Sequence, residues 1–188
     1  MRKLIYVSFT TVFLIGVLFA AAFGESYPNS AEGIKCATLP PPGIYYKMTN
    51  AYITADKLID SKGSKMPVDF DAKIFATVQR LIWMTKDIKL FGADYGFQLL
   101  CPLTYKNIEI GASSYDDSRW AFGDLIVEPF VLGWHKQNYD VIAAIAFFLP
   151  TGDHDDLVDP GEDMLTTLLT LGATYYIDKP KSLTVTVR

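Results

Sequence analysis

The feature that most constrains this chain is a predicted β-hairpin over residues 123–153, in which two strand-length apolar segments flank a polar turn at residues 135–138. The second segment alternates strictly, with the period of a β-strand. One face is predominantly apolar and the other carries small and polar side chains. The apolar face holds Tyr139, Val141, Ala143, Ile145, Phe147 and Leu149, and the other includes Asp140, Ala144 and Ala146. An acidic segment over residues 153–163 follows, and we expect it to be a solvated loop.

The N-terminus predicts export. A short basic start precedes an apolar stretch over residues 4–19, and small residues follow it, so residues 1–24 are typical of a cleaved signal peptide. Cleavage after Gly24 fits best, and cleavage after Ala22 is the alternative. An uncleaved anchor is less favoured, because the apolar stretch is short for a membrane-spanning helix.

Composition points to a membrane protein built from strands. The chain has 188 residues, which leaves one domain at most after the signal peptide, and a net charge of -4. Its 14% aromatic residues and its mean hydropathy of +0.18 are high for a soluble exported domain. No later apolar stretch is long enough for a transmembrane helix, so the hydrophobic residues must lie in short alternating segments. A transmembrane β-barrel uses them in this way. The mild acidity and the lack of a Lys/Arg cluster argue against nucleic acid as a partner.

Seven strands are predicted along the chain. They cover residues 44–55, 68–84, 89–101, the two arms of the hairpin, 165–177 and 183–187. Short turns are predicted at residues 85–88, 135–138 and 178–182, and long loops at 56–67, 102–123 and 153–163, with residues 107–112 as a possible extension of the third strand. Alternation of short turns with long loops is typical of outer-membrane barrels, whose turns face the periplasm.

The predicted fold is therefore all-β: an antiparallel up-and-down transmembrane β-barrel, incomplete at about seven strands, after an N-terminal signal peptide helix. Residues 25–43 form a periplasmic lead-in and residues 44–188 the partial barrel, whose apolar face would meet outer-membrane lipid. The competing interpretation is a soluble periplasmic β-sandwich or small ligand-binding barrel, which would bury the apolar face inside.

Three further features bear on this fold. The alternation slips at Arg80, which indicates a bulge over residues 81–84 or the interfacial end of the strand, with Trp83 at headgroup level. Pro129 donates no ladder hydrogen bond, and we expect a bulge there because a closed barrel has no edge strand. Cys36 lies before the first predicted strand and Cys101 at the end of the third. These strand ends point to opposite sides of the predicted membrane, so a disulfide between them stays open but is not favoured.

Several motifs resemble one known family. They are Pro41-Pro42-Gly43 before an aromatic strand, Gly92-Ala93-Asp94-Tyr95-Gly96, Phe122-Gly123-Asp124 leading into Leu132-Gly133-Trp134-His135, and Leu149-Pro150-Thr151-Gly152-Asp153. They are similar to the SphA/MetA-type outer-membrane family, which is named for the meta-pathway of phenol degradation, and the resemblance covers essentially the whole mature chain. It implies an outer-membrane β-barrel transporter for aromatic or other hydrophobic compounds. It implies no particular substrate residues.

The chain also departs from that family. Members similar to it continue through further strands, whereas the seventh predicted strand stops at Arg188 without the terminal aromatic strand that barrel assembly machinery recognises. We therefore expect a truncated reading frame or a fragment, with the barrel assembly machinery as the partner of the complete protein.

Catalysis is not expected. The two histidines, His135 and His154, lie in a short turn and an acidic loop, and no catalytic triad spacing, phosphate loop or zinc pattern accompanies them. No cofactor and no metal site is predicted. The carboxylates of residues 153–163 could hold a divalent cation, but their spacing does not match an EF-hand and a solvated charged loop is favoured.

The leading hypothesis is an outer-membrane channel for small hydrophobic or aromatic compounds, followed by a structural or adhesive surface barrel and then by a periplasmic binding module. A lumen of mixed charge would suit a neutral permeant. The candidate lumen residues are Lys47, Asp71, Lys73, Gln79, Asp94, Gln98 and Glu128. Two strands give sharper expectations: Ile74 outward with Lys73 inward, and Ile145 outward with Ala144 inward.

Overall fold

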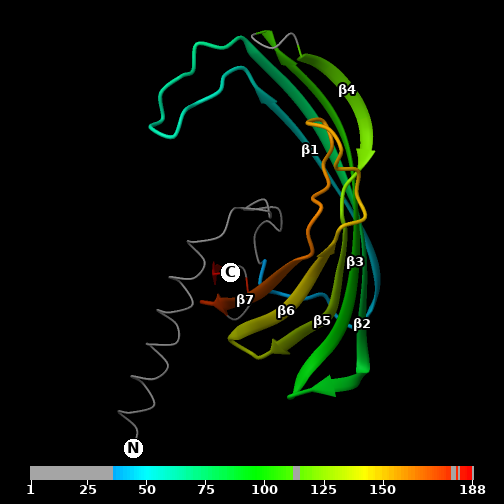
Figure 1. Cartoon of the computed structure of the whole chain (residues 1–188). Coiled ribbons are helices and arrows are strands. Elements are labelled where there is room, and N and C mark those ends of the chain that lie inside the picture. The colour runs from blue at the N-terminus through cyan, green and yellow to red at the C-terminus, as the bar shows by residue number, and fades with distance from the viewer. Residues whose placement is uncertain (1–35, 112–114, 179–180, 182, 188) are drawn as a thin grey trace, which may run out of the picture. The chain divides into compact units, whose positions relative to one another are not determined.

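The structure, a computed structural model of the chain, describes residues 36–111, 115–178, 181 and 183–187, and its regular elements there are strands (Figure 1). These are β1 (Gly43–Ala55), β2 (Phe70–Leu90), β3 (Ala93–Ile110), β4 (Tyr115–Phe122), β5 (Leu125–His135), β6 (Tyr139–Leu149), β7 (Thr166–Tyr176) and β8 (Thr184–Val187). The predicted signal peptide lies outside the described residues. Within them, no helix has the length and apolar character needed to cross a membrane.

The strands form one curled antiparallel sheet, as Figure 1 shows. Its order is β1-β2-β3-β5-β6-β7-β8, and β4 pairs with the upper part of β3 beside this path. Every strand on the path therefore pairs with the next one along it in up-and-down fashion. The prediction of an all-β, incomplete antiparallel barrel is confirmed, with seven strands on the main path.

The pairing register defines two faces, because side chains directly opposite each other in a ladder point to the same side. We call inner the face that carries Arg80, Gln98 and Glu128, which are 9%, 2% and 7% exposed. We call outer the face that carries Ile44, Leu169 and Leu171, each more than 70% exposed. Buried polar groups on one side and exposed apolar groups on the other invert the arrangement of a soluble sheet.

The predicted central hairpin is confirmed, since β5 and β6 pair from Leu125 opposite Leu149 to His135 opposite Asp140. The expected bulge at Pro129 is also confirmed, because the register shifts between Val127 and Phe130. The tyrosine of the neighbouring strand, Tyr95, donates its hydroxyl to the Pro129 carbonyl at 2.7 Å. This bond satisfies a carbonyl in the region where the bulge interrupts the ladder.

The prediction of a turn at residues 85–88 is wrong. Strand β2 continues to Leu90, which pairs with Ala93, so the turn consists of Phe91 and Gly92. Both residues have positive φ, 53° and 76°, as a two-residue type I′ hairpin requires. The register irregularity falls between Thr85 and Lys89 instead. The sequence hid this turn because phenylalanine is an unusual residue at positive φ.

The long loop predicted over residues 102–123 is largely strand. Strand β3 runs to Ile110, as the alternative extension suggested, and β4 returns along it from Tyr115 to Phe122. Of the two alternatives for residues 81–84, the bulge is wrong, because β2 pairs with β1 and with β3 without a shift through this region. Cys36 and Cys101 are not joined to each other, and Cys101 lies on the outer face opposite Gln79.

The acidic segment after β6 is not solvated throughout. Val158 is fully buried and packs with Ala72 and Ile108 of β2 and β3, with Phe70, Ile110 and Tyr115 around them. A second apolar cluster lower in the sheet joins Leu100, Ile126 and Ala146. The first cluster therefore attaches the long connection between β6 and β7 to the far ends of β2 and β3.

Candidate functional site

The candidate site is the inner face of the sheet, where strands β1, β2, β3 and β5 bring polar side chains together. Lys47 pairs with Arg80, and Gln98 pairs with Glu128. The Arg80 Nε donates to the Gln98 Oε1 at 2.6 Å. Side chains of this kind are buried at a cost unless they are hydrogen-bonded. The inner face thus carries a layer of mixed charge, which we call the central polar layer: Lys47, Arg80, Gln98 and Glu128.

A second polar group lies on the inner face near the turn between β5 and β6. Asp140 is 2% exposed and accepts a hydrogen bond from the hydroxyl of Tyr176 in β7. His135 Nδ1 lies 3.2 Å from the other carboxylate oxygen of Asp140. The Tyr176 oxygen is also 3.2 Å from the Thr38 hydroxyl, which donates to it because the tyrosine proton is directed to Asp140. Four residues thus form one hydrogen-bonded chain, the lower polar chain.

A third polar group fixes the connection between β6 and β7. The carboxylate of Asp124 accepts from the backbone N–H groups of Gly152 and Glu162, both at 3.0 Å. The Arg119 Nε donates to the Asp159 carboxylate at 2.6 Å, and Lys106 Nζ donates to the Asp159 carbonyl at 2.7 Å. Charge-assisted bonds of this kind are among the stronger hydrogen bonds in proteins. The acidic connection is therefore tied to β3, β4 and the start of β5.

Two pKa values reflect this attachment. Burial alone would raise the pKa of the Asp159 carboxyl, but the hydrogen bond and charge of Arg119, with backbone N–H donors, outweigh it and hold the pKa below the ordinary 3.8. Burial lowers the pKa of Lys106, and the charge of Asp159 opposes that shift. The ionised form of Asp159 is therefore the one that the fold stabilises.

The outer face carries two rows of aromatic side chains. In the upper row the ring of Trp120 lies 6.0 Å from that of Phe75 and 5.5 Å from that of Tyr105. In the lower row the ring of Tyr95 lies 6.3 Å from that of Trp83 and 6.1 Å from that of Phe130. Between the rows, the outer face of β3 carries Phe97, Leu99, Cys101 and Leu103.

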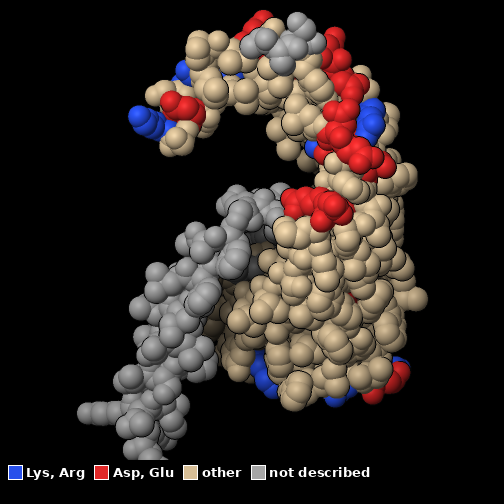
Figure 2. Space-filling view, viewed as in Figure 1, with Lys and Arg blue, Asp and Glu red and all other residues tan. Residues whose placement is uncertain are grey.

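The separation of the two rows follows from β3, which contributes Tyr95 to the lower and Tyr105 to the upper row. Ten residues of strand span about 33 Å at about 3.3 Å per residue. At the tilt of a membrane barrel, about 40°, this corresponds to about 25 Å along the barrel axis. Figure 2 shows the corresponding uncharged band, with charged side chains gathered above it and at its lower end.

The register divides the seven predicted lumen residues between the two faces. Lys47, Asp94, Gln98 and Glu128 share the inner face, and Asp94 there forms an ion pair with Lys89. Asp71, Lys73 and Gln79 lie on the outer face, and Ile74 lies on the inner one, which reverses the expectation for this strand. In β6 the register agrees with the expectation, since Ile145 pairs with the exposed Leu169 and Ala144 pairs with Thr170.

The three residues on the outer face have local partners. Lys73 and Asp71 form an exposed ion pair at 2.9 Å, above the upper aromatic row. Gln79 lies lower, between the rows, where it accepts a hydrogen bond from the Tyr46 hydroxyl and donates to Thr77 Oγ1 at 2.8 Å. These bonds reduce the cost of placing an amide in an apolar band.

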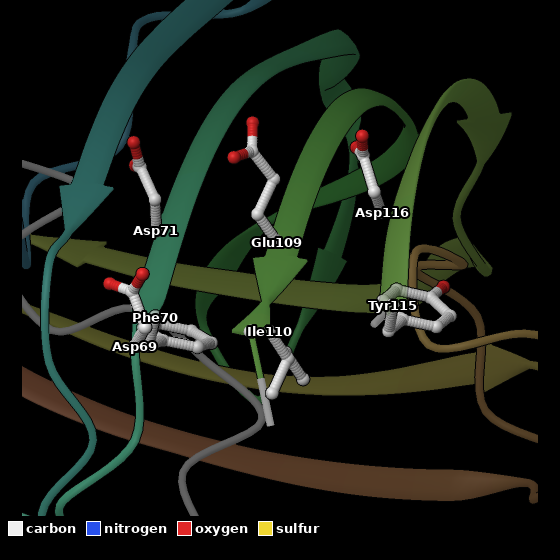
Figure 3. Close-up of a pocket in the computed structure, with 8 residues that line it drawn as sticks. Asp69, Phe70, Asp71, Glu109, Ile110, Tyr115 and Asp116 are labelled. Carbon is white, nitrogen blue, oxygen red and sulfur yellow. The ribbon is translucent and has the colours of Figure 1, made fainter. Parts of the chain in front are cut away.

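Asp71 belongs to a row of carboxylates at the far end of β2, β3 and β4. Asp71 pairs with Glu109, and Glu109 pairs with Asp116, so the three point the same way from neighbouring strands (Figure 3). They line a cavity of about 310 Å³. Within the described ranges, no group of three or more His, Cys, Asp or Glu side chains is arranged to hold a metal ion.

Sequence reasoning missed several inner-face residues. Arg80 coincides with a break in the alternation, and Asp140 stands among the small residues of its strand, yet both are buried and hydrogen-bonded. Tyr176 is not among the predicted site residues. A usable signal existed, because Asp140 and Tyr176 both alternate with large apolar residues, and a polar residue at such a position faces away from lipid.

A curled antiparallel sheet with buried polar groups inside and an apolar, aromatic-edged outer face defines the class of partial β-barrels. Residues 55–188 match the family model described as Putative MetA-pathway of phenol degradation. The chain therefore belongs to this family, which is associated with phenol degradation. Searches of the curated proteins and of the solved structures returned no match.

Proposed function

We propose that this chain acts as an outer-membrane channel or transporter for small hydrophobic or aromatic compounds. The family supports the chemical class of the permeant, because its description concerns phenol degradation. The curled sheet supports a barrel, which with the helix is one of the two structures that can span a lipid bilayer. The predicted signal peptide is compatible with export, and the partners are then outer-membrane lipid and the barrel assembly machinery.

The observation that carries the proposal is the pair of aromatic rows about 25 Å apart on the outer face. Aromatic residues favour the two interfaces of a membrane because one part of the side chain is apolar and the other is polar. The apolar band of an outer-membrane barrel is also about 25 Å tall. A soluble sandwich would cover this face with a second sheet, and the exposed Trp83, Phe130 and Leu171 argue against such cover.

The central polar layer supports passage of neutral molecules. Lys47, Arg80 and Glu128 place both signs of charge on one surface. A surface of a single sign would attract one class of ions, whereas mixed charge favours neither cations nor anions. Phenol and similar compounds are neutral near pH 7, because a phenolic hydroxyl ionises near pH 10.

No catalytic role is proposed. His135 pairs with Asp140 at the start of β6, and His154 follows the end of that strand, whose eleven residues span about 36 Å, so the two histidines do not share one site. His135 is near Asp140, whose other carboxylate oxygen accepts from Tyr176, and His154 Nδ1 is 3.2 Å from the Gly152 carbonyl. Each of these contacts can be purely structural, because it holds one histidine ring in place. We propose no cofactor.

The test uses the protein reconstituted in lipid vesicles that enclose β-glucosidase. The probe is 4-nitrophenyl β-glucoside, a neutral aromatic solute that releases coloured 4-nitrophenol when it enters. Cellobiose, a neutral solute with a sugar in place of the aromatic ring, is the matched control. We expect faster entry of the aromatic glucoside than through protein-free vesicles, and faster entry than that of cellobiose. Equal rates with and without protein would exclude a channel for this class of compound.

Fluorescence of the three tryptophans separates the membrane assignment from the transport assignment. Lipids brominated near the headgroup should quench Trp83 and Trp120 more strongly than lipids brominated at the chain ends, because both residues lie in the aromatic rows. A detergent-free soluble protein without quenching would instead support the periplasmic sandwich.

A further inference from the structure

We propose that the inner face contains a docking site for the chain's own segment Cys36–Leu39, built by glycines at positions 133 and 172. This inference goes beyond the proposed function and does not depend on it. The segment precedes β1 in the chain but contacts β5 and β7, and Ala37 is fully buried there. We call it the N-terminal strap.

The docking site is a row across three strands. Gly133 of β5 pairs with Ile142 of β6, and Ile142 pairs with Gly172 of β7, so the three positions lie side by side on the inner face. Ile142 is 3% exposed. The two glycines leave room on either side of its side chain, and the strap occupies that room.

The strap approaches both glycines closely. A Cβ atom at Gly133 would lie 2.8 Å from Leu39 Cδ1, and one at Gly172 would lie 2.9 Å from Ala37 Cβ. Both approaches are closer than carbon atoms normally come. Two residues of the strap thus enter the space of two absent side chains, one from each flanking strand.

A hydrogen bond lies between these two apolar contacts. The Thr38 hydroxyl donates to the Tyr176 oxygen at 3.2 Å, and Tyr176 in turn donates to the buried Asp140. The strap therefore completes the lower polar chain, because it supplies the donor that the tyrosine oxygen accepts from. Alternation along the strap matches this arrangement, with Ala37 and Leu39 directed to the glycines.

The chain after the strap holds it close to the inner face. Prolines at residues 40–42 restrict the backbone, and Tyr45 of β1 donates its hydroxyl to the Pro41 carbonyl at 2.8 Å. A segment that only led into β1 would need contacts with β1 and β2. The strap instead contacts Gly133, Gly172 and Tyr176, which lie about a hundred or more residues later in the chain. These long-range contacts are what we interpret as a docking site.

The experiment measures the reactivity of the native thiol of Cys36 toward a membrane-impermeant maleimide, in a protein whose Cys101 is replaced by serine. Gly172→Ala should displace the strap and raise the labelling rate roughly tenfold or more, because overpacking of this kind is relieved by local opening. Adding Ala37→Gly removes the opposing Cβ and should return the rate close to that of the parent. Ala173→Val, on the outer face of the same strand, should leave it unchanged.

The double variant makes the test specific. Reversal by Ala37→Gly would support docking, since strain from the Val187 carbonyl, which is also near Gly172, is not relieved by a change in the strap. An unchanged rate in Gly172→Ala, or an increase that Ala37→Gly does not reverse, would overturn the proposal. If Gly172→Ala does not fold, Gly133→Val tests the same site through Leu39, and Leu39→Ala, which removes the opposing Cδ1 atom, then takes the place of Ala37→Gly as the reverting change. Faster labelling that Leu39→Ala reverses would support docking, and an unchanged or unreversed rate would overturn it.

Discussion

Substitutions at single residues can test which face of the sheet contacts lipid. Ile145 and Ala144 are neighbours in β6, and the register directs Ile145 to the side of the exposed Leu169 and Ala144 to the side of Thr170. An arginine at Ile145 would face hydrocarbon near the middle of the band and should cost about 2–4 kcal/mol of folding free energy. An arginine at Ala144 would face the inner surface and should cost much less. Urea titrations of folding into vesicles measure both, and the reverse ranking would show that the aromatic face is an interior core.

A second residue pair controls the acidic connection between β6 and β7. Because the pKa of Asp159 in the folded protein is held below 3.8, its contribution is present above that pH and is lost as the pH falls through the lower folded value. Arg119→Met removes the guanidinium that, with backbone N–H donors, lowers the pKa of Asp159 against the effect of burial, so release should then occur at higher pH. Limited proteolysis of residues 150–165 against pH measures release. Asp155→Asn, in the same loop and exposed, is the control and should not move the midpoint.

Lys73 and Ile74 show a limit of prediction from the sequence. Lys73 was expected inside and Ile74 outside, and the structure has the opposite. The alternation of the two faces is as predicted, but the surroundings of each face differ, because the upper part of β2 extends beyond the apolar band. There the outer face meets water and Lys73 pairs with Asp71, while the inner face is covered by Val158.

At the scale of the element, β2 contains both environments without a break in its pairing with β1. Below Arg80 its outer residues are the exposed Leu81 and Trp83, and above Gln79 its inner residues include the buried Ala72. Near Arg80 the apolar residues switch from one alternating set of positions to the other. This switch therefore reflects different surroundings along one strand, not an irregularity of the strand. A pattern read over a fixed window cannot distinguish this from a bulge, because both shift the apolar positions by one.

The turn between β2 and β3 allows the cost of its positive φ angles to be measured. Gly92 has φ of 76°, where a residue with a Cβ pays about 1–2 kcal/mol, so Gly92→Ala should destabilise the fold by about that amount. Phe91→Asn places a residue suited to positive φ at the first turn position and should stabilise the hairpin by a few tenths of a kcal/mol up to about 1 kcal/mol. Urea unfolding in vesicles compares them. Gly63→Ala, in the loop after β1, has the same kind of backbone strain at φ of 81° and is the comparison for a glycine outside the sheet.

At the scale of the whole molecule, the antiparallel order and the central hairpin could be predicted because local alternation and short turns specify them. The inner-face contacts could not. The lower polar chain joins Thr38 to Tyr176 across 138 residues, and no local pattern encodes such a pairing. The folded acidic connection was equally hidden, since its composition favours solvent and only the packing of Val158 reveals its position.

In the whole molecule, the docked N-terminal strap should limit passage through the proposed channel. A strap seated on the inner face occupies part of the path that a permeant would follow near the end of the sheet that holds Asp140. Minor states of proteins are commonly populated at about 0.1–10%, so displacing a strap that is docked most of the time should raise the permeation rate about tenfold or more. Entry of 4-nitrophenyl β-glucoside into vesicles should therefore increase in Gly172→Ala and fall again when Ala37→Gly is added. Ala173→Val should leave the rate unchanged. Faster thiol labelling of Cys36 without faster entry would mean that the strap docks on the inner face but does not limit passage.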